Sequence, residues 1–332
     1  MSSDVTPAST VVELITGGWR AQAVYTAVKL RLPDHVEAGQ TTDAELAAAS
    51  GAKEDGIHRL MRLLVAMDVF AGDSTGYRNT DVSRALLDRP GSQRDMCLLY
   101  GEDFYTAWGH AAEAISTVSS GFELAYGKPV YAYFTADPTA AERFQGAMRA
   151  GNLFFDAVPG VFDFAGKRVV DLGGGSGQLL GAILAATQDA RGVLLDLPNV
   201  VAAATSRLSE FADRLELVGG DMFESVPAGG DVYLLCRVLA GHSDDAVVKL
   251  FTDIRRNLTA PSARLLLLDR LVVDEGSTVL PALWDLHLLM TTGGRHRSLV
   301  ELRTLLDRAG LEVELAADLP VETTALIVRA KA

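Results

Sequence analysis

The chain has 332 residues, of which 48% are hydrophobic, and a formal net charge of −13 at pH 7. This size is sufficient for a large core, most simply in two domains, and the acidic charge argues against non-specific binding to nucleic acid or anionic membranes. No apolar run is long enough for a membrane span, no signal-peptide pattern is found, and the two cysteines, Cys97 and Cys236, give no disulfide framework. We therefore expect a protein of the reducing cytoplasm.

Residues 1–95 are expected to be mainly helical. Thr42 and Glu45 have the spacing of a capping box at the start of a short helix. Residues 53–70 then place apolar side chains at helical spacing, namely Ile57, Leu60, Met61, Leu64 and Met67. The stretch "AGDSTGYRNTD" (71–81) has the composition of a small hairpin. Helix, turn, helix and hairpin together predict a winged-helix pattern.

Residues 96–160 form a second helical stretch that is rich in aromatic side chains. It contains Tyr100, Phe104, Tyr105, Trp108, Tyr131, Tyr133, Phe134, Phe144, Phe154 and Phe155. We expect most of these rings to pack in an ordinary core and a few to line an aromatic-walled pocket.

From about residue 167 onward, short β-rich runs alternate with amphipathic stretches, which predicts an α/β domain with a mainly parallel sheet. In "VVDLGGGSGQLLGAIL" (169–184) a strand ends at Asp171, a glycine-rich turn follows, and a helix begins. Such glycines let the backbone approach a ligand beside a helix N-terminus. The next strand ends at Asp196, where an acid can hold ribose hydroxyls. The third strand is followed by Asp221, Met222 and Phe223, placed to cradle a purine.

These motifs, with "DVYLLCRVL" and "DLHLLMTTGGRHRS" followed by Glu301, resemble those of class I S-adenosylmethionine-dependent methyltransferases. With the winged helix, the whole chain resembles the dimeric small-molecule methyltransferases of plant and actinomycete secondary metabolism. The resemblance implies a winged-helix dimerisation domain (1–95), a helical substrate-pocket segment (96–160) and a Rossmann-like catalytic domain (161–332). It also implies a homodimer, a small-molecule acceptor, and no nucleic-acid or membrane partner.

The resemblance further implies that S-adenosylmethionine is the cofactor. The residues that match the family's cofactor-binding positions are Asp171, Gly173, Gly175, Asp196, Asp221, Met222, Phe223 and Arg237. Arg237 stands where the family usually has a lysine.

The segment "VLAGHSDD" (238–245) departs from the family pattern. The O-methylating members usually carry His-Asp-Trp after this strand, and that histidine is the general base. Alignment without gaps puts Ala240 at the base position and His242 at the tryptophan. Because loss of a general base typically costs about 10²- to 10⁴-fold in rate, base-assisted O-methylation is disfavoured. Locally, Ser243, Asp244 and Asp245 are also typical of a helix start, in which His242 would be incidental.

A second histidine, His287, lies on the later helix that lines the acceptor pocket in the family. Two histidines from separate segments predict an incomplete metal site for iron or zinc, with positions left open for substrate and water. "GH" at 241–242 and "DLH" at 285–287 resemble metal-assisted C-methyltransferases of 2-oxo acids from antibiotic biosynthesis. In this hypothesis the metal stabilises an enolate, and Asp269 and Glu301 orient His287 or the substrate.

The loop after Gly294 is expected to be solvated, with His296, Arg295 and Arg297 exposed. Two alternatives to metal-assisted β-C-methylation stay open, namely O-methylation of a phenolic or carboxylate natural product and a non-methylating relative that binds the same cofactor. A further hypothesis, an acidic winged-helix regulator that binds DNA, is disfavoured by the acidic charge and by the cofactor motif.

Overall fold

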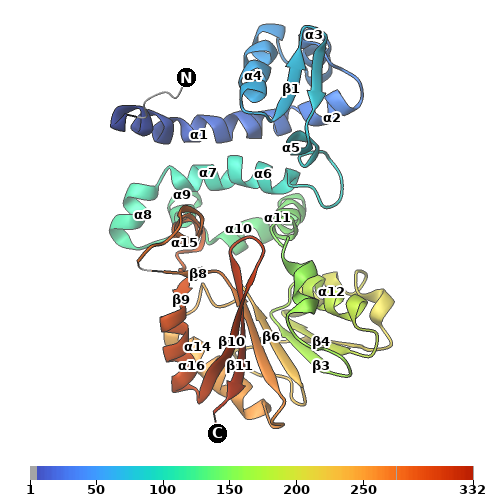
Figure 1. Ribbon diagram of the computed structural model, residues 1–332, viewed down its shortest axis with the longest axis vertical. Helices are drawn as coiled ribbons and strands as arrows, with labels where there is room; N and C mark the ends of the chain where they lie inside the picture. The colour runs from blue at the N-terminus through green and yellow to red at the C-terminus, as the bar shows by residue number, and fades with distance from the viewer. Residues whose placement is uncertain (1–5, 274, 332) are drawn as a thin grey trace. The chain divides into compact units, whose positions relative to one another are not determined.

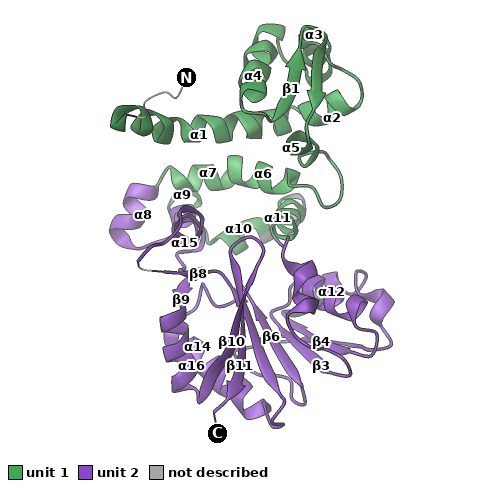
Figure 2. Cartoon of the chain, viewed as in Figure 1, with its two compact units in different colours: residues 1–110, 124–151 green, residues 111–123, 152–332 purple. Residues whose placement is uncertain are grey.

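The computed structural model describes residues 6–273 and 275–331, and none of the helices in these ranges is both long and apolar enough to cross a membrane (Figure 1). The chain forms two compact units, one of residues 1–110 with 124–151 and one of residues 111–123 with 152–332 (Figure 2). The predicted boundaries at residues 95 and 160 are not those of the compact units, and the three-part division stays a prediction.

The first unit begins with helices and a small hairpin, as expected. Thr42 and Glu45 form the predicted capping box, and Ile57, Met61 and Leu64 are buried. The elements are α1 (Pro7–Lys29), α2 (Leu32–Glu37), α3 (Asp43–Ser50), α4 (Glu54–Ala66), β1 (Phe70–Asp73) and β2 (Gly76–Asn79), and β1 pairs with β2 antiparallel. These elements share one core.

The rest of this unit consists of short helices, with aromatic rings in contact. Phe134 stacks on Phe144 with 4.8 Å between ring centroids, and Arg143 forms an ion pair with the buried Asp103. The helices are α5 (Asp81–Arg84), α6 (Arg94–Gly101), α7 (Asp103–Trp108), α10 (Val130–Thr135) and α11 (Pro138–Ala150), while α9 (Gly121–Tyr126) runs across the boundary between the units.

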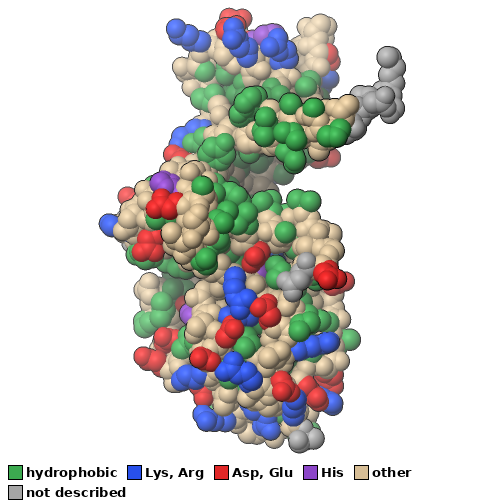
Figure 3. All heavy atoms as spheres, turned by 90° about the vertical axis from the view of Figure 1, so that its left-hand side faces the viewer, with side chains coloured by type: hydrophobic (Ala, Val, Ile, Leu, Met, Phe, Trp, Pro, Cys, Tyr) green, Lys and Arg blue, Asp and Glu red, His purple; other side chains and the backbone are tan. Residues whose placement is uncertain are grey.

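Helix α1 exposes a row of large apolar side chains. Val11, Val12, Leu14, Ile15 and Trp19 are each more than half exposed. Figure 3 shows apolar side chains gathered on this face of the first unit. An exposed apolar face of this extent is typical of an interaction surface.

The second unit is built on a seven-stranded sheet in the order β10-β11-β7-β6-β3-β4-β5. Five strands run parallel, β3 (Arg168–Leu172), β4 (Arg191–Asp196), β5 (Leu215–Gly219), β6 (Val232–Cys236) and β7 (Arg264–Asp269). Strand β11 (Thr323–Ala330) lies antiparallel between β7 and β10 (Leu311–Leu319). The prediction of a mainly parallel sheet is therefore confirmed.

Helices cover both faces of this sheet (Figure 1). They are η1 (Phe155–Gly160), α12 (Gln178–Ala186), α13 (Pro198–Ala204), η2 (Ser209–Phe211), α14 (Asp244–Asn257) and α16 (Leu299–Arg308). Helix α15 (Val279–Thr292) contacts α8 (Ala111–Thr117), and the short strands β8 (Leu271–Val272) and β9 (Arg297–Ser298) pair in parallel. Because the carboxyl ends of β3, β4, β5 and β6 meet at one edge, the predicted cofactor motifs come together there.

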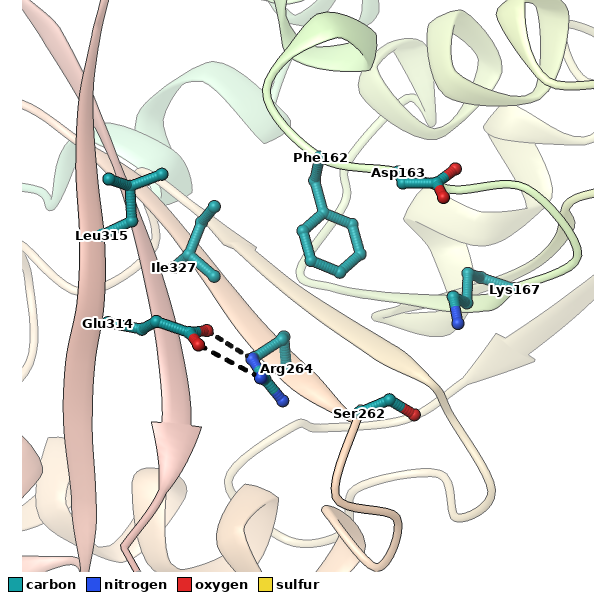
Figure 4. Close-up of a pocket in the computed structure, with 8 residues that line it drawn as sticks. All are labelled: Phe162, Asp163, Lys167, Ser262, Arg264, Glu314, Leu315 and Ile327. Carbon is teal, nitrogen blue, oxygen red and sulfur yellow. Dashed lines mark hydrogen bonds and ion pairs between the residues drawn. The ribbon is translucent and has the colours of Figure 1, made fainter.

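A cavity of about 330 Å³ lies at the other edge of the sheet (Figure 4). Lys167 and Ser262 precede parallel strands β3 and β7, and Arg264 forms an ion pair with Glu314 on β10 in the wall of this cavity. Its position at the amino ends of the strands separates it from the glycine-rich turn.

Candidate active site

The glycine-rich turn after β3 leaves open space for a ligand. Gly173, Gly175 and Gly177 have φ values of +70°, +59° and +71°, which side chains rarely tolerate. A Cβ on Gly174 would lie 2.4 Å from Asp171 Oδ2, whereas among the described atoms nothing lies within 4 Å of a Cβ built on Gly175. The turn is thus closely packed against the sheet at Gly174 and open at Gly175.

Two carboxylates flank this turn. Asp196 at the end of β4 accepts a hydrogen bond from the Gly175 amide at 2.8 Å and one from the Leu197 amide at 2.7 Å. Asp171 is fully buried, and among the described residues neither of its oxygens has a hydrogen-bond partner. Burial, with the nearby Asp196 charge, raises the pKa of Asp171 to about 7.

The residues after β5 and β6 line the same edge. The Met222 sulfur would lie 3.4 Å from a Cβ on Gly173, and the Phe223 amide donates a hydrogen bond to Asp221 Oδ1 at 2.8 Å. The His242 ring packs on Phe223 with 4.3 Å between centroids. His242 therefore lies beside the predicted purine cradle.

Arg237, the first residue after β6, has a left-handed backbone with φ +55°. Its guanidinium lies 4.4 Å from the centroid of the Phe154 ring and donates hydrogen bonds to Asn152 Oδ1 and Thr323 Oγ1 at 3.4 and 3.3 Å. An unusual backbone conformation held by such contacts often marks a functional position.

Ser243 caps helix α14, as predicted, because its hydroxyl accepts a hydrogen bond from the Ala246 amide. The Arg295 amide also donates a hydrogen bond to the Ala240 carbonyl at 3.1 Å. The segment from Leu239 to Asp244 is therefore tied to the loop that follows α15.

The expectation that Arg297 and His296 are exposed is wrong. Arg297 is 4% exposed, and its guanidinium donates hydrogen bonds to Asp244 Oδ1 and to the carbonyls of Leu239 and His242. No local pattern in the sequence indicates this role, because the partners of the guanidinium lie more than 50 positions before it in the chain. Arg295 is half exposed, as expected, and pairs with Glu301 and Asp244.

His296 is 7% exposed, with its Nδ1 3.6 Å from the buried Asp269 Oδ1, a separation too long for a hydrogen bond. Its amide donates a hydrogen bond to Asp285 Oδ1 at 2.6 Å. Glu301 accepts hydrogen bonds from the Ser298 amide and from Arg295. The predicted role of Asp269 and Glu301 in orienting His287 stays a prediction.

His287 lies on α15 against the Trp284 ring, 5.7 Å between centroids, and the Arg270 guanidinium covers that same ring at 4.1 Å. Burial, and to a lesser extent the charge of Arg270, lowers the pKa of His287 to about 4. The ring is therefore neutral near neutral pH.

A cavity of about 390 Å³ opens beside the end of β6. It is lined by Val118, Ala240, Gly241, His242, Ser243, Asp285, Leu286, Leu289, Gly293, Gly294 and Arg295. His242 and Ala240 are in this wall and His287 is not. Burial lowers the pKa of His242, so that its ring is neutral at pH 7.

No cluster of three or more His, Cys, Asp or Glu side chains suited to a metal ion occurs among residues 6–273 and 275–331. The structure thus gives no support to the expected iron or zinc site.

The family model for the O-methyltransferase domain matches residues 108–312, and that for the O-methyltransferase dimerisation domain matches residues 12–89. The chain belongs to the O-methyltransferase family. It is an S-adenosylmethionine-dependent methyltransferase of the kind found in secondary metabolism, and solved relatives hold S-adenosylmethionine or S-adenosylhomocysteine. The open glycine turn and its acids fit this cofactor.

Within the O-methyltransferase family the chain is similar to phenazine-1-carboxylate N-methyltransferase of Pseudomonas aeruginosa, with 43% identity over 100% of this chain and 99% of the relative. It is also similar to 3-amino-4-hydroxybenzoate 4-O-methyltransferase of Streptomyces cremeus, with 39% identity over 94% of this chain and 87% of the relative. The solved pyocyanin biosynthetic protein PhzM superposes with a TM-score of 0.90 at 43% identity, over 98% of this chain and 99% of that one.

Proposed function

We propose that this enzyme methylates a ring nitrogen of an aromatic natural product that carries a carboxylate. The observation that carries the proposal is Ala240, which lines the cavity. In the alignment of the motif after β6, Ala240 stands at the position where O-methylating relatives usually carry their basic histidine. A pyridine-type nitrogen has a free lone pair and no proton, so its methylation needs no base. The similarity to a phenazine-1-carboxylate N-methyltransferase supports the same chemistry.

The cofactor supplies an electrophilic methyl group on its sulfonium. The lone pair of the acceptor nitrogen forms the new N–C bond as the C–S bond breaks, and positive charge moves from sulfur to the ring. No proton is transferred in this step, so the protein acts by holding the acceptor in line, which is a large effect. Val118, Leu286 and Leu289 provide apolar surface for the ring faces.

Asp285 is placed to stabilise the cation that N-methylation creates. Asp285 is one of the residues that line the cavity, and its Oδ1 accepts a hydrogen bond from the His296 amide at 2.6 Å. A carboxylate fixed in advance stabilises developing positive charge without reorganising during the reaction. We therefore assign Asp285 the electrostatic role in this proposal.

O-methylation of a hydroxylated aromatic acid is the second candidate. The observation in its favour is His242, which lines the same cavity and is neutral at pH 7, and therefore able to accept a proton. Similarity to the 3-amino-4-hydroxybenzoate 4-O-methyltransferase agrees with this reading.

The β-C-methylation of a 2-oxo acid receives no such support. The similar proteins are O- and N-methyltransferases, and no metal cluster occurs in the described residues. No observation supports the alternative of a relative that binds the cofactor without methylating. The cytoplasmic location stays a prediction.

We also infer that the enzyme is a homodimer that buries the apolar face of α1. The dimerisation-domain match covers residues 12–89, which include Leu14, Ile15 and Trp19. Exposed apolar side chains of this number are stabilised by a partner.

The test uses the purified enzyme, ¹³C-methyl-labelled S-adenosylmethionine, and three acceptors offered separately. These are phenazine-1-carboxylate, 3-amino-4-hydroxybenzoate and a 2-oxo acid. An N-methyl carbon signal with the phenazine supports the proposal. A methoxy signal with the hydroxybenzoate and none with the phenazine contradicts it and favours the second candidate.

A further inference from the structure

Asp171 is a buried acid whose hydrogen-bonding capacity is unused. Its side chain is 0% exposed, and both oxygens are without hydrogen-bond partners among the described residues. Buried polar groups are nearly always paired, so an orphan carboxyl in a ligand site calls for an explanation. An ionised carboxylate in such surroundings is costly, and protonation removes that cost.

The groups around Asp171 do not offset a negative charge. From β4, Asp196 adds a second carboxyl, and its repulsion together with burial raises the pKa of Asp171 to about 7. From β6, the Cys236 thiol has its own pKa raised by burial and is neutral. Arg237 follows Cys236 but is engaged by Phe154, Asn152 and Thr323. The turn and helix α12 on the third side contribute no ionisable side chain between residues 173 and 186.

Asp171 also lies directly under the ligand site. A Cβ on Gly174 would lie 2.4 Å from its Oδ2, and the next residue, Gly175, faces open space. A ligand that settles on this turn brings its charge close to a carboxyl that has no other compensation.

We propose that Asp171 is protonated in the cofactor-free enzyme and that the positive charge of the bound cofactor ionises it, so that cofactor binding releases a proton to bulk water. The inference needs only cofactor binding, which the family already establishes, and no acceptor. Its failure would leave the proposed acceptor chemistry untouched. Two charges can act on Asp171, the α-ammonium that S-adenosylmethionine shares with S-adenosylhomocysteine, and the sulfonium that only S-adenosylmethionine carries.

The sign of the pH dependence follows from the proton that is lost. Below about pH 7 the free enzyme must give up a proton to bind, so the dissociation constant rises as pH falls, by at most about tenfold per pH unit. Above about pH 7 Asp171 is already ionised, so it no longer makes the dissociation constant depend on pH. Near pH 6 the free enzyme carries this proton at most of its sites, so binding releases the larger part of one proton per site.

The experiment is titration calorimetry in two buffers of different ionisation enthalpy, near pH 6, with S-adenosylmethionine and separately with S-adenosylhomocysteine. The ligand amino group, with a pKa of about 8, is already protonated there and contributes little. Release near one proton for both ligands identifies the ammonium as the cause, and release for S-adenosylmethionine alone identifies the sulfonium. Equal heats in both buffers for both ligands would overturn the proposal.

Asp171→Asn is the matched variant, because it keeps the shape of the side chain and cannot ionise. We expect it to bind with no proton release and with a dissociation constant that does not change with pH near 6. Asp196→Asn retains the proton release, but its midpoint moves to lower pH because one repelling charge is gone. Release that persists in Asp171→Asn would contradict the assignment to Asp171.

Infrared difference spectra supply a readout without calorimetry and without turnover. Cofactor addition to the wild type should remove a protonated-carboxyl band that Asp171→Asn lacks. If Asp171→Asn fails to fold, this band is followed in the wild type labelled with ¹³C-aspartate, which shifts carboxyl bands of aspartate only. Absence of any protonated aspartate in the free enzyme near pH 6 would overturn the proposal.

Discussion

Arg297 donates two hydrogen bonds to Asp244 Oδ1, at 3.0 and 2.8 Å, from a guanidinium that is almost fully buried. The same guanidinium binds the carbonyls of Leu239 and His242. One side chain from β9 therefore holds both ends of the segment that contains Ala240, and the shape of the cavity wall depends on it.

Arg297→Gln should lower the free energy of unfolding by about 2 to 3 kcal/mol, because it breaks a partly buried ion pair and leaves two carbonyls without their donor. Arg295→Gln is the control, since Arg295 contacts the same Asp244 from a half-exposed position and should cost less than about 1 kcal/mol. Urea unfolding of both variants measures the difference. Equal losses would contradict the role given to Arg297.

Replacing His242 separates the two candidate reactions. With His242→Ala, kcat for methylation of a ring nitrogen should stay within about 3-fold, whereas base-assisted O-methylation should fall by about 10²- to 10⁴-fold. Because the pKa of His242 is lowered, wild-type O-methylation at saturating S-adenosylmethionine would decline only as pH falls below the usual histidine range, and N-methylation under the same conditions would show no such decline. Steady-state rates against pH on both acceptors measure this. A large fall in the kcat of His242→Ala for N-methylation would contradict a reaction that needs no base.

Chelation should leave activity unchanged. The described residues contain no cluster suited to a metal ion, and His242 and His287 contact Phe223 and Trp284 respectively. Enzyme dialysed against chelator, with its metal content measured by mass spectrometry, should turn over at the rate of untreated enzyme. Activity that is lost on dialysis and restored by iron or zinc would revive the metal hypothesis.

The dimer should depend on the apolar face of α1. Ile15→Glu together with Trp19→Glu places charge on side chains that are 68% and 70% exposed, and light scattering should then report a monomer. Val300→Glu, on a side chain 74% exposed on α16 in the second unit, is the control and should leave the dimer intact. A dimer that survives the α1 double variant would show that its interface lies elsewhere.

The raised pKa of Asp171 should also appear in how the free energy of unfolding of the cofactor-free enzyme depends on pH. Since the folded-state pKa of Asp171 is raised, the native state binds more protons than the unfolded state between about pH 4 and 7, and stability falls as pH rises through this range. His287, whose pKa is lowered to about 4, acts in the opposite direction over pH 4 to 6.5. The quantity to measure is therefore the free energy of unfolding of Asp171→Asn minus that of the wild type. This difference should increase by up to about 4 kcal/mol from pH 4 to 8. A difference that does not change with pH would contradict a raised pKa.

Local patterns in the sequence were enough to predict several local elements of the fold. The capping box at Thr42 and Glu45, the helix start at Ser243 and the turn after Asp171 each depend on residues that are neighbours in the chain. The burial of His296 and Arg297 was not predictable in this way, because Asp269, which lies near His296, and Asp244, which pairs with Arg297, are 27 and 53 positions away in the chain. The antiparallel insertion of β11 between β7 and β10 is likewise a non-local pairing.

The metal hypothesis requires His242 and His287 to lie in one pocket wall. In the structure His242 lines the cavity with Ala240, while His287 packs on Trp284 and is absent from that wall. The sequence pattern placed both residues on acceptor-side segments but did not determine which way each side chain turns on its own element.

If Ala240 marks a methyl transfer that needs no base, Ala240→His should change one reaction and not the other. The variant restores the residue of the O-methylating relatives and is compared with wild type on a phenazine carboxylate and on a hydroxybenzoate. We expect it to gain O-methylation, by up to the roughly 10²- to 10⁴-fold typical of a general base, and to gain nothing in N-methylation. Faster N-methylation by the variant, or rapid wild-type O-methylation that the variant leaves unchanged, would contradict this expectation.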